Sequence, residues 1–241
     1  MQLIISHSLP EKLILPMGYH HVLQSIIYHN LQESAGISTF LHNRGFDADK
    51  RQYRMFVFSG LKGKYEIEAG KIIFREQVSF QVRSPEHLFL KLLKESIEKN
   101  GINYLGQRYT DVKVTLADDV ISTNHLKIRM LSPICIYSTD RESGKTHFYG
   151  PDEAEFAKRV NENFRRKYLA YTGIEPSSDI VLKPLRIEKK DKYVTKYKGF
   201  YISGWLGEYE LSGEPKYLDF LYQTGLGSKN SQGFGMFEVA E

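Results

Sequence analysis

The chain has 241 residues, of which 41% are hydrophobic and 26% are charged, a composition typical of a folded globular protein. The net charge of +4 permits an anionic partner but does not require one. The single cysteine, Cys135, excludes a disulfide framework and a cysteine-based zinc site. No apolar run approaches the ~20 residues that span a bilayer, and the N-terminus lacks the features of a signal peptide. We therefore expect a soluble, cytoplasmic protein of one or two domains, with no membrane contact.

The first half of the chain predicts the element order β-α-β-β-α-β. A helix over residues 17–33 and a second helix over residues 85–99 are indicated by apolar residues at helical spacing and by Pro85 at the start of the second. Strands are expected at residues 2–6, 53–59, 64–69, 71–75 and 110–117, with a hairpin turn at 68–70.

The second half predicts the same order again. A long helix is expected at residues 151–171 and a shorter one at 215–223, each beginning at a proline. Strands are expected at residues 125–137, 179–187, 193–205 and 234–239. The chain therefore predicts an α+β fold of two tandem ferredoxin-like (βαββαβ) domains, with residues 1–120 in the first and 121–241 in the second.

The most specific stretch of sequence is GLGSKNSQGFG at residues 225–235. It fits neither a P-loop nor a dinucleotide-binding turn, because no Gly-Lys-Ser/Thr closes it and no βαβ unit can follow it. Its glycines indicate unusual backbone angles and close approach to another chain, and Lys229 adds positive charge. We expect this loop to be peripheral to both cores, so that valine at Gly233 and Gly235 would weaken ligand binding without unfolding the protein.

The loop resembles the C-terminal glycine-rich signature of the RAMP proteins (repeat-associated mysterious proteins) of CRISPR systems. Within them the chain is most similar to the sixth Cas family, endoribonucleases that cut precursor CRISPR RNA within its repeats. A second match covers residues 16–61, with PMGYHHVLQSIIYHNL, FLHNRGF and YRMFVFSGL. The Ser-Pro-Ile at 132–134 and the aromatic-rich helix near 151–171 also fit. The resemblance spans nearly the whole chain and implies the same tandem ferredoxin-like, RRM-like fold.

Three residues are candidates for catalysis. His42 lies in a loop just beyond a helix, where a histidine has the freedom for acid–base work near neutral pH, although a surface histidine with no role fits equally. Tyr28 lies opposite the apolar stripe of its helix. The resemblance implies that both are catalytic. It also implies a catalytic cation near Lys50, a role that Arg51 or Arg54 could take instead.

Two basic tracts are candidates for RNA binding, with a solvated surface as the alternative for each. Basic faces interleaved with aromatic residues suit a phosphate backbone with stacked bases. One tract lies on one face of the 151–171 helix and the other at residues 183–198. The candidate RNA-binding residues are Arg44, Arg51, Arg54, Lys158, Arg159, Arg165, Arg166, Lys190, Lys192, Gly225, Gly227, Lys229, Gly233 and Gly235.

The resemblance implies a metal-independent endoribonuclease of CRISPR repeat RNA that needs no cofactor. The 2′-hydroxyl of the RNA would attack the adjacent phosphorus, giving a 2′,3′-cyclic phosphate. His42 would act as acid–base residue, Tyr28 would orient the nucleophile and Lys50 would stabilise the developing charge. The alternatives are a non-catalytic RNA-binding subunit of a CRISPR effector complex and a RAMP-like protein without an RNA role. Contacts with other Cas proteins, and the choice between monomer and homodimer, stay open.

Overall fold

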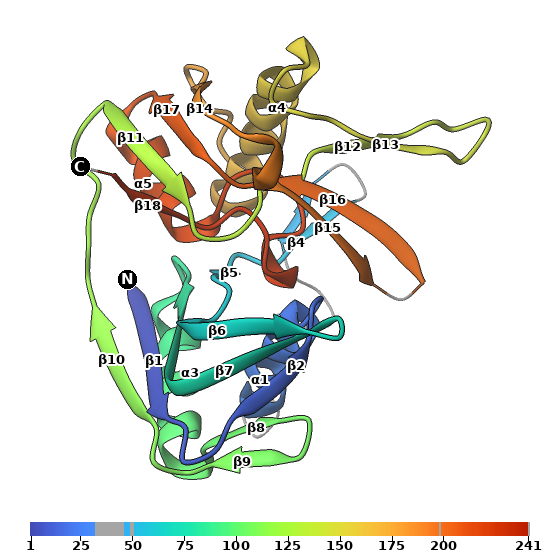
Figure 1. Cartoon of the computed structure of the whole chain (residues 1–241). Coiled ribbons are helices and arrows are strands. Elements are labelled where there is room, and N and C mark those ends of the chain that lie inside the picture. The colour runs from blue at the N-terminus through green and yellow to red at the C-terminus, as the bar shows by residue number, and fades with distance from the viewer. Residues whose placement is uncertain (32–45, 49–50, 198, 241) are drawn as a thin grey trace.

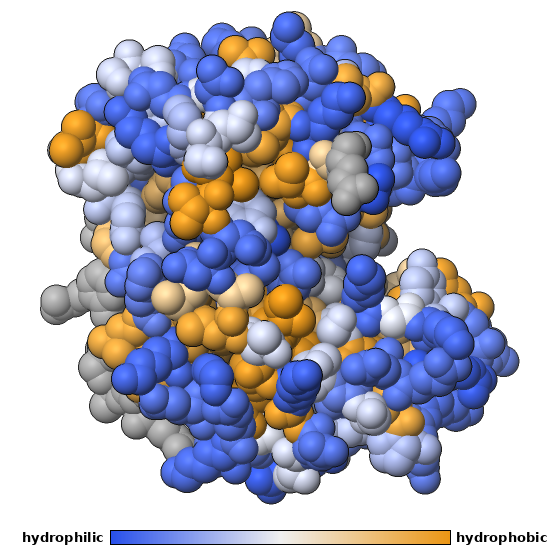
Figure 2. Space-filling model, turned by 90° about the vertical axis from the view of Figure 1, so that its left-hand side faces the viewer, coloured by the Kyte–Doolittle hydropathy of each residue, from blue (hydrophilic) through white to orange (hydrophobic). Residues whose placement is uncertain are grey.

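A computed structural model describes residues 1–31, 46–48, 51–197 and 199–240. Two α+β units lie one above the other, each with its own sheet and its own pair of helices (Figure 1). Both units follow the ferredoxin-like order that the sequence predicts, and the predicted fold class is confirmed. Seen after a 90° turn, polar residues cover much of both lobes and apolar residues gather toward the middle of the face (Figure 2).

The first unit is built on a sheet with the order β10-β1-β7-β2, and β5 and β6 also pair with β7. Its two helices are α1 (His20–Leu31) and α3 (His87–Asn100). Its strands are β1 (Gln2–Ser8), β2 (Leu13–Pro16), β5 (Val57–Phe58), β6 (Lys62–Glu68), β7 (Lys71–Arg83) and β10 (Lys113–Ala117).

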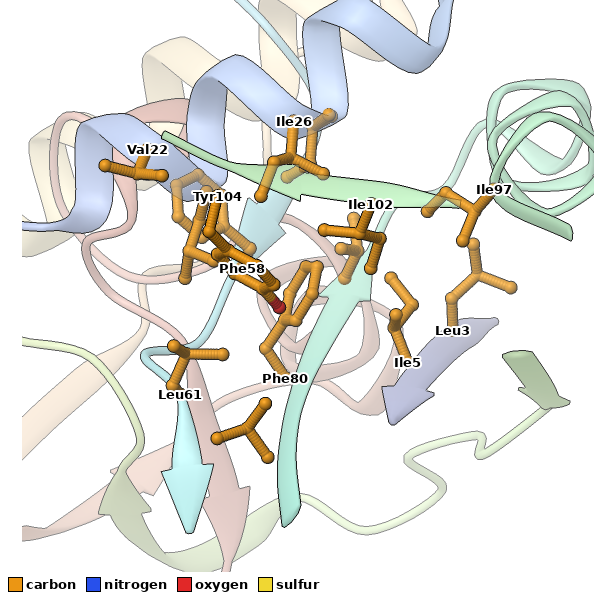
Figure 3. Close-up of a cluster of buried hydrophobic side chains, with 14 of the residues drawn as sticks. Leu3, Ile5, Val22, Ile26, Phe58, Leu61, Phe80, Ile97, Ile102 and Tyr104 are labelled. Atoms are coloured by element: carbon orange, nitrogen blue, oxygen red, sulfur yellow. The ribbon is translucent and has the colours of Figure 1, made fainter. Parts of the chain in front are cut away.

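The core of this unit lies between the sheet and its helices. Leu3 and Ile5 of β1 are fully buried, and in register they lie opposite Val82 and Phe80 of β7. This period of two places one face of each strand against α1 and α3. Figure 3 shows side chains from both strands meeting Val22 and Ile26 of α1 and Ile97 of α3. The apolar stripe predicted for the first helix is confirmed, since Val22, Leu23, Ile26, Ile27 and Asn30 are all buried.

The second unit has a sheet with the order β14-β17-β11-β18. Its helices are α4 (Ala154–Thr172) and α5 (Pro215–Thr224). Its sheet strands are β11 (His125–Met130), β14 (Val181–Arg186), β17 (Glu208–Ser212) and β18 (Phe237–Val239).

The strand predicted at residues 193–205 is wrong as a sheet strand. This segment forms a separate hairpin of β15 (Lys192–Tyr197) and β16 (Phe200–Trp205). The central sheet position belongs to β17, which pairs with both β11 and β14. The hairpin instead reaches from the second unit down toward the first (Figure 1).

Three further two-stranded hairpins extend the units. They are β3 (Phe46–Ala48) with β4 (Arg51–Tyr53), β8 (Ile102–Tyr104) with β9 (Gln107–Tyr109), and β12 (Tyr137–Thr139) with β13 (Thr146–Phe148). The pair β12–β13 projects from the body of the second unit (Figure 1). No helix in the described part of the chain combines the length and the apolar character that crossing a bilayer requires.

The two cores meet at two consecutive residues. Met55 is buried in the core of the second unit, and Phe56 is buried in the core of the first. Phe46 and Tyr53, which belong to the same stretch of the first unit, also pack against the second core. The segment between α1 and β5 therefore joins the two units through buried apolar contacts.

Candidate nucleic-acid interface

The glycine-rich loop, residues 225–235, lies buried between the two units. It begins after α5 and contains the short 3-10 helix η3 (Asn230–Gln232). Gln24 of α1 donates a hydrogen bond of 2.8 Å to the carbonyl oxygen of Ser231. On its other side the loop joins the second unit, where the amide of Gly235 donates to the carbonyl of Pro133. The expectation that the loop is peripheral is therefore wrong, because it forms the junction between the units.

Two of the glycines are required by this close packing. Gly233 and Gly235 have φ values of 86° and 83°, in the left-handed region that side chains disfavour. A Cβ on Gly233 would lie 2.7 Å from Cε2 of Phe58, and a Cβ on Gly235 would overlap the carbonyl oxygen of Leu226. Neither position has room for a side chain. These glycines therefore serve the packing of the loop against β5 and against its own first turn.

A buried lysine of α4 lies beneath the loop. Lys167 is 2% exposed, and its Nζ donates to the carbonyl oxygens of Thr224 and Gly225 and to Oδ1 of Asn230. Asn230 in turn donates from Nδ2 to two carbonyl oxygens of the loop. Burial lowers the pKa of Lys167 from 10.5 to about 7. The side chain of Lys167 thus connects the start and the middle of the glycine-rich loop to α4.

The outer side of the loop forms one wall of a pocket of about 460 Å³. Three cationic residues line it, Arg54, Lys167 and Lys229, and none of the described lining residues is an aspartate or a glutamate. The remaining lining residues are Gln52, Tyr53, Tyr137, Thr139, Asn163, Gly227, Ser228, Asn230, Ser231 and Gln232. A polar pocket whose described charged residues are all cations favours an anionic ligand.

Tyr28 lies on α1 of the first unit and does not line this pocket. It is one helical turn beyond Gln24, which contacts the loop at Ser231. Its ring is half-buried and packs edge-on against Phe56, with centroids 5.9 Å apart. Arg54, two residues before Phe56, lines the pocket. Among the residues that the sequence singled out, the structure thus brings Arg54, Lys229 and the glycine-rich loop together in one pocket, while Tyr28 contacts Phe56.

The other catalytic candidates, His42 and Lys50, lie outside the described residues, as does the RNA-binding candidate Arg44. Arg51 belongs to β4 by its backbone, but its side chain is not described. Of the three cations that the sequence leaves open for the catalytic role, Arg54 is therefore the one whose side chain the structure describes.

The comparison with known protein families decides the identity. Residues 111–239, more than half of the chain, match the model of the family described as CRISPR associated protein Cas6, C-terminal. The chain belongs to the Cas6 family. The family that the sequence resembles is thereby confirmed.

Relatives of the chain agree with the Cas6 assignment. The CRISPR-associated endoribonuclease Cas6 of Pyrococcus furiosus is 26% identical over 234 residues, covering 93% of this chain and 83% of that protein. A solved structure of a Cas6-related protein from Pyrococcus furiosus superposes with a TM-score of 0.83 at 22% identity, covering 100% of this chain and 98% of the other. A RAMP protein described as binding different RNA substrates superposes with a TM-score of 0.82 at 21% identity, covering 100% and 99%.

The basic face of α4 in this Cas6 family member is neutralised by its own neighbours. Arg165 pairs with Glu175 and Asp179, at 3.3 Å and 2.8 Å. The other three cations of that face each pair with an acid on α4 itself: Lys158 and Arg159 with Glu155, and Arg166 with Glu162. A phosphate backbone would have to compete with these carboxylates.

The second basic tract, residues 183–198, covers most of β14, the 3-10 turn at Lys189–Asp191 and the strand β15 of the β15–β16 hairpin. Lys190 pairs with Glu188, and Lys192 lies over the ring of Trp205. Tyr193 stacks on His20 of α1, with centroids 5.4 Å apart, so this ring packs against the first unit. The exposed aromatic residues are instead Phe200 and Tyr201, 78% and 69% exposed. Sequence reasoning missed these two, because it placed them inside a single sheet strand.

Lys167 and Asn163 were also missed, although the sequence carried a signal for the lysine. Val160, Phe164 and Lys167 follow one another at helical spacing, so Lys167 falls on the apolar face of α4 rather than on its basic face. A lysine at such a position must find buried partners. In the run Arg165-Arg166-Lys167 all three residues are basic, so the sequence alone does not show that Lys167 is buried while the two arginines are not.

Proposed function

We propose that this protein is a metal-independent endoribonuclease that cleaves CRISPR repeat RNA. The observation that carries the proposal is the cationic pocket at the junction of the two units, in which none of the described lining residues is acidic. The relative from Pyrococcus furiosus is a CRISPR-associated endoribonuclease, which supports the same reaction class for this chain.

The proposed chemistry uses a nucleophile that the substrate already carries. The RNA 2′-hydroxyl attacks the adjacent phosphorus, and the products are a 2′,3′-cyclic phosphate and a 5′-hydroxyl. His42 transfers the protons, Tyr28 orients or helps deprotonate the 2′-hydroxyl, and a cation stabilises the phosphorane charge. Lys50 is the first candidate for that cation, and the pocket position of Arg54 supports it as the alternative. No metal ion is needed to generate a nucleophile in this scheme.

The proposed RNA path uses the two surfaces that combine positive charge with accessible groups. One is the pocket at the glycine-rich loop, with Arg54 and Lys229. The other is the β15–β16 hairpin, where the exposed rings of Phe200 and Tyr201 can stack on unpaired bases and Lys192 and Lys196 can meet phosphates. The four cations on the basic face of α4, Lys158, Arg159, Arg165 and Arg166, contribute less, because each is paired with an acid.

Incubation of the purified protein with the repeat RNA found beside its own gene tests the proposal. We expect cleavage at one position, a cyclic phosphate on the upstream product and full activity in excess EDTA. A 2′-deoxy substitution at the scissile nucleotide should abolish the cut. Loss of activity on chelation would reject the metal-independent scheme. Binding of the repeat without cleavage would instead favour the non-catalytic RNA-binding subunit.

A further inference from the structure

The strand β6 forms an open edge of the sheet of the first unit. Among the described strands it pairs only with β7, which leaves its other side open. Lys62 and all the residues from Lys64 to Glu68 are exposed. Figure 1 shows β6 along the rim of the sheet, next to β7. Because an edge strand leaves backbone donors and acceptors unpaired on one side, it can take up a further strand.

The backbone of β6 is regular enough to accept a neighbour. The register shift against β7 falls between Gly63 and Lys64, and the extra residues, Glu76 and Gln77, belong to β7. The irregularity therefore bends the inner strand, and β6 continues along the edge without a bulged residue of its own.

Two exposed apolar side chains lie on one face of this edge. Tyr65 is 60% exposed and Ile67 is 59% exposed. In register they lie opposite Phe74 and Ile72 of β7, which are buried in the core of the first unit. The core-facing side of the sheet therefore continues to its rim at Tyr65 and Ile67 and is left largely exposed there. A partner strand would bring further side chains against these two residues.

The charges on the other face of β6 indicate which strand would fit. Two lysines, Lys62 and Lys64, precede two glutamates, Glu66 and Glu68, and all four alternate with the residues of the apolar face. Consider an antiparallel pairing with β6 of a second copy, centred on Tyr65. Lys62 then lies opposite Glu68 of the second copy, and Lys64 lies opposite its Glu66. By symmetry each charged residue of both strands faces an opposite charge.

Other ways of pairing two copies do not have this complementarity. A parallel pairing in register places lysine opposite lysine. An antiparallel pairing centred on Lys64 or on Glu66 places that residue opposite its own like charge. Within the chain Lys64 pairs with Glu76 and Glu66 pairs with Arg75, but all of these side chains are more than half exposed, and such pairs are weak.

We propose that β6 is a self-association edge, through which two copies of this chain pair as antiparallel strands about a two-fold axis at Tyr65. The sheets of the two first units would form one continuous sheet, with Tyr65 against Tyr65 of the second copy and Ile67 against its Gly63. The sequence leaves monomer and homodimer open, and this edge favours the homodimer. The proposal does not depend on the proposed cleavage of RNA.

Exchange of the two central charges tests this pairing. Lys64→Glu makes both central charges of the strand negative, and Glu66→Lys makes both positive. Each variant alone places like charges opposite one another, so its self-association should be about tenfold weaker than that of the wild type or less. An equimolar mixture of the two variants should recover association, because their strands are complementary. Lys113→Glu on β10, an exposed position on another edge strand of the same sheet, is the matched control and should associate like the wild type.

Sedimentation equilibrium of the full chain without RNA, over a range of protein concentrations, measures the association. We expect the wild type to approach twice the monomer mass as its concentration rises. Circular dichroism checks that each variant folds, and recovery in the mixture shows that the loss does not come from unfolding. Should either variant not fold, Lys62→Glu and Glu68→Lys make the same exchange at the outer pair.

A wild-type protein that stays monomeric would overturn the proposal, whether or not it cleaves RNA. The same holds for a dimer that both variants leave unchanged, and for a loss that the mixture does not recover. Association that requires repeat RNA would identify the RNA as the bridge and would also overturn it. A charge-dependent dimer that binds the repeat and never cuts it would reject the proposed cleavage and still support pairing through β6.

Discussion

Arg83 of β7 lies over the ring of Tyr222 of α5, with its guanidinium carbon 3.6 Å from the ring centroid. The same side chain donates to Oε1 of Gln2 and to the carbonyl oxygen of Phe237 in β18. One buried arginine of the first unit thus contacts a helix and a strand of the second. Burial lowers the pKa of Arg83 to about 10, and the side chain remains charged at neutral pH.

Arg83→Met should destabilise the protein as a whole. The change leaves the buried carbonyl of Phe237 without its donor and removes the contact with Tyr222, a loss of roughly 2–4 kcal/mol in the free energy of unfolding. Urea denaturation measures it. Arg75→Met is the control, since Arg75 is 56% exposed in its pair with Glu66 and should contribute less than about 1 kcal/mol. Equal losses in the two variants would show that Arg83 does not join the units.

Gly235→Ala should lower the free energy of unfolding by at least about 3 kcal/mol, because the new Cβ overlaps the carbonyl of Leu226 at a positive φ. Gly144→Ala is the matched control. It also has a positive φ, of 67°, but its Cβ would meet nothing within 4 Å, and about 1 kcal/mol is expected. Thermal and urea unfolding compare the two. A Gly235→Ala protein as stable as the control would restore the view of the loop as peripheral.

His42→Ala should slow cleavage of the repeat RNA by roughly 10²–10⁴-fold, the usual effect of removing a positioned acid–base group. RNA affinity should stay near the wild-type value, because one neutral side chain adds little to phosphate binding. Single-turnover cleavage and filter binding measure the two quantities. His87→Ala, at the exposed start of α3, is the control. Undiminished cleavage by His42→Ala would remove this histidine from the mechanism.

The β15–β16 hairpin and the basic face of α4 should respond differently to substitution. Alanine at both Phe200 and Tyr201 removes exposed rings and should weaken RNA binding by about tenfold with little change in stability. Arg165→Glu breaks the pairs with Glu175 and Asp179 and should cost about 1 kcal/mol of stability with a smaller effect on affinity. Filter binding and thermal unfolding rank the two changes. The reverse ranking would identify α4 as the principal RNA surface.

Stability should depend on pH through Lys167. Its folded-state pKa of about 7 lies below its usual 10.5, so between these values the unfolded chain binds more protons than the folded protein. The free energy of unfolding therefore rises with pH in this window, by at most about 1.4 kcal/mol per pH unit. The cations Arg54 and Lys229 and the phenols of Tyr53 and Tyr137 share the pocket.

Asn163→Asp isolates the contribution of Lys167 to this pH dependence. The new carboxylate favours the charged ammonium and raises the pKa of Lys167. The control is Asn103→Asp in the β8–β9 hairpin, which makes the same change of charge at a residue that does not line this pocket. The rise in the free energy of unfolding between pH 7 and pH 9 should be smaller in Asn163→Asp than in this control. Urea denaturation at a series of pH values measures the difference. Parallel curves for the two variants would contradict a depressed pKa at Lys167.

The fold could be predicted from local sequence patterns wherever one face of an element is buried. The stripe of Val22, Ile26 and Ile27 has the helical period. Pro151, just before α4, and Pro215, the first residue of α5, mark the starts of these helices. The missed strand β17 shows the limit of this reasoning. Residues 193–205 have strand composition throughout, and only tertiary pairing reveals that they fold back on themselves and leave the sheet position to Glu208–Ser212.

For the candidate site, the sequence indicates which residues are involved but not which contacts hold them together. The glycine-rich motif and Tyr28 stand out in sequence. The partners that hold them, Gln24 with Ser231 and Lys167 with Asn230, are far apart along the chain and follow no local rule. The wrong expectation for Gly233 has the same origin, because Phe58 fills the space beside it from another unit.

The packing of residues 225–239 against β5, α1 and Arg83 has a consequence for biosynthesis. During translation Val57, Phe58 and Gln24 leave the ribosome long before the loop residues that cover them. The apolar surface of the first unit that these residues cover therefore stays exposed to non-native contacts until the chain has almost completely emerged. Nascent chains that end before residue 225 should therefore bind chaperones. Chains in which residues 225–239 have left the ribosome should no longer bind them.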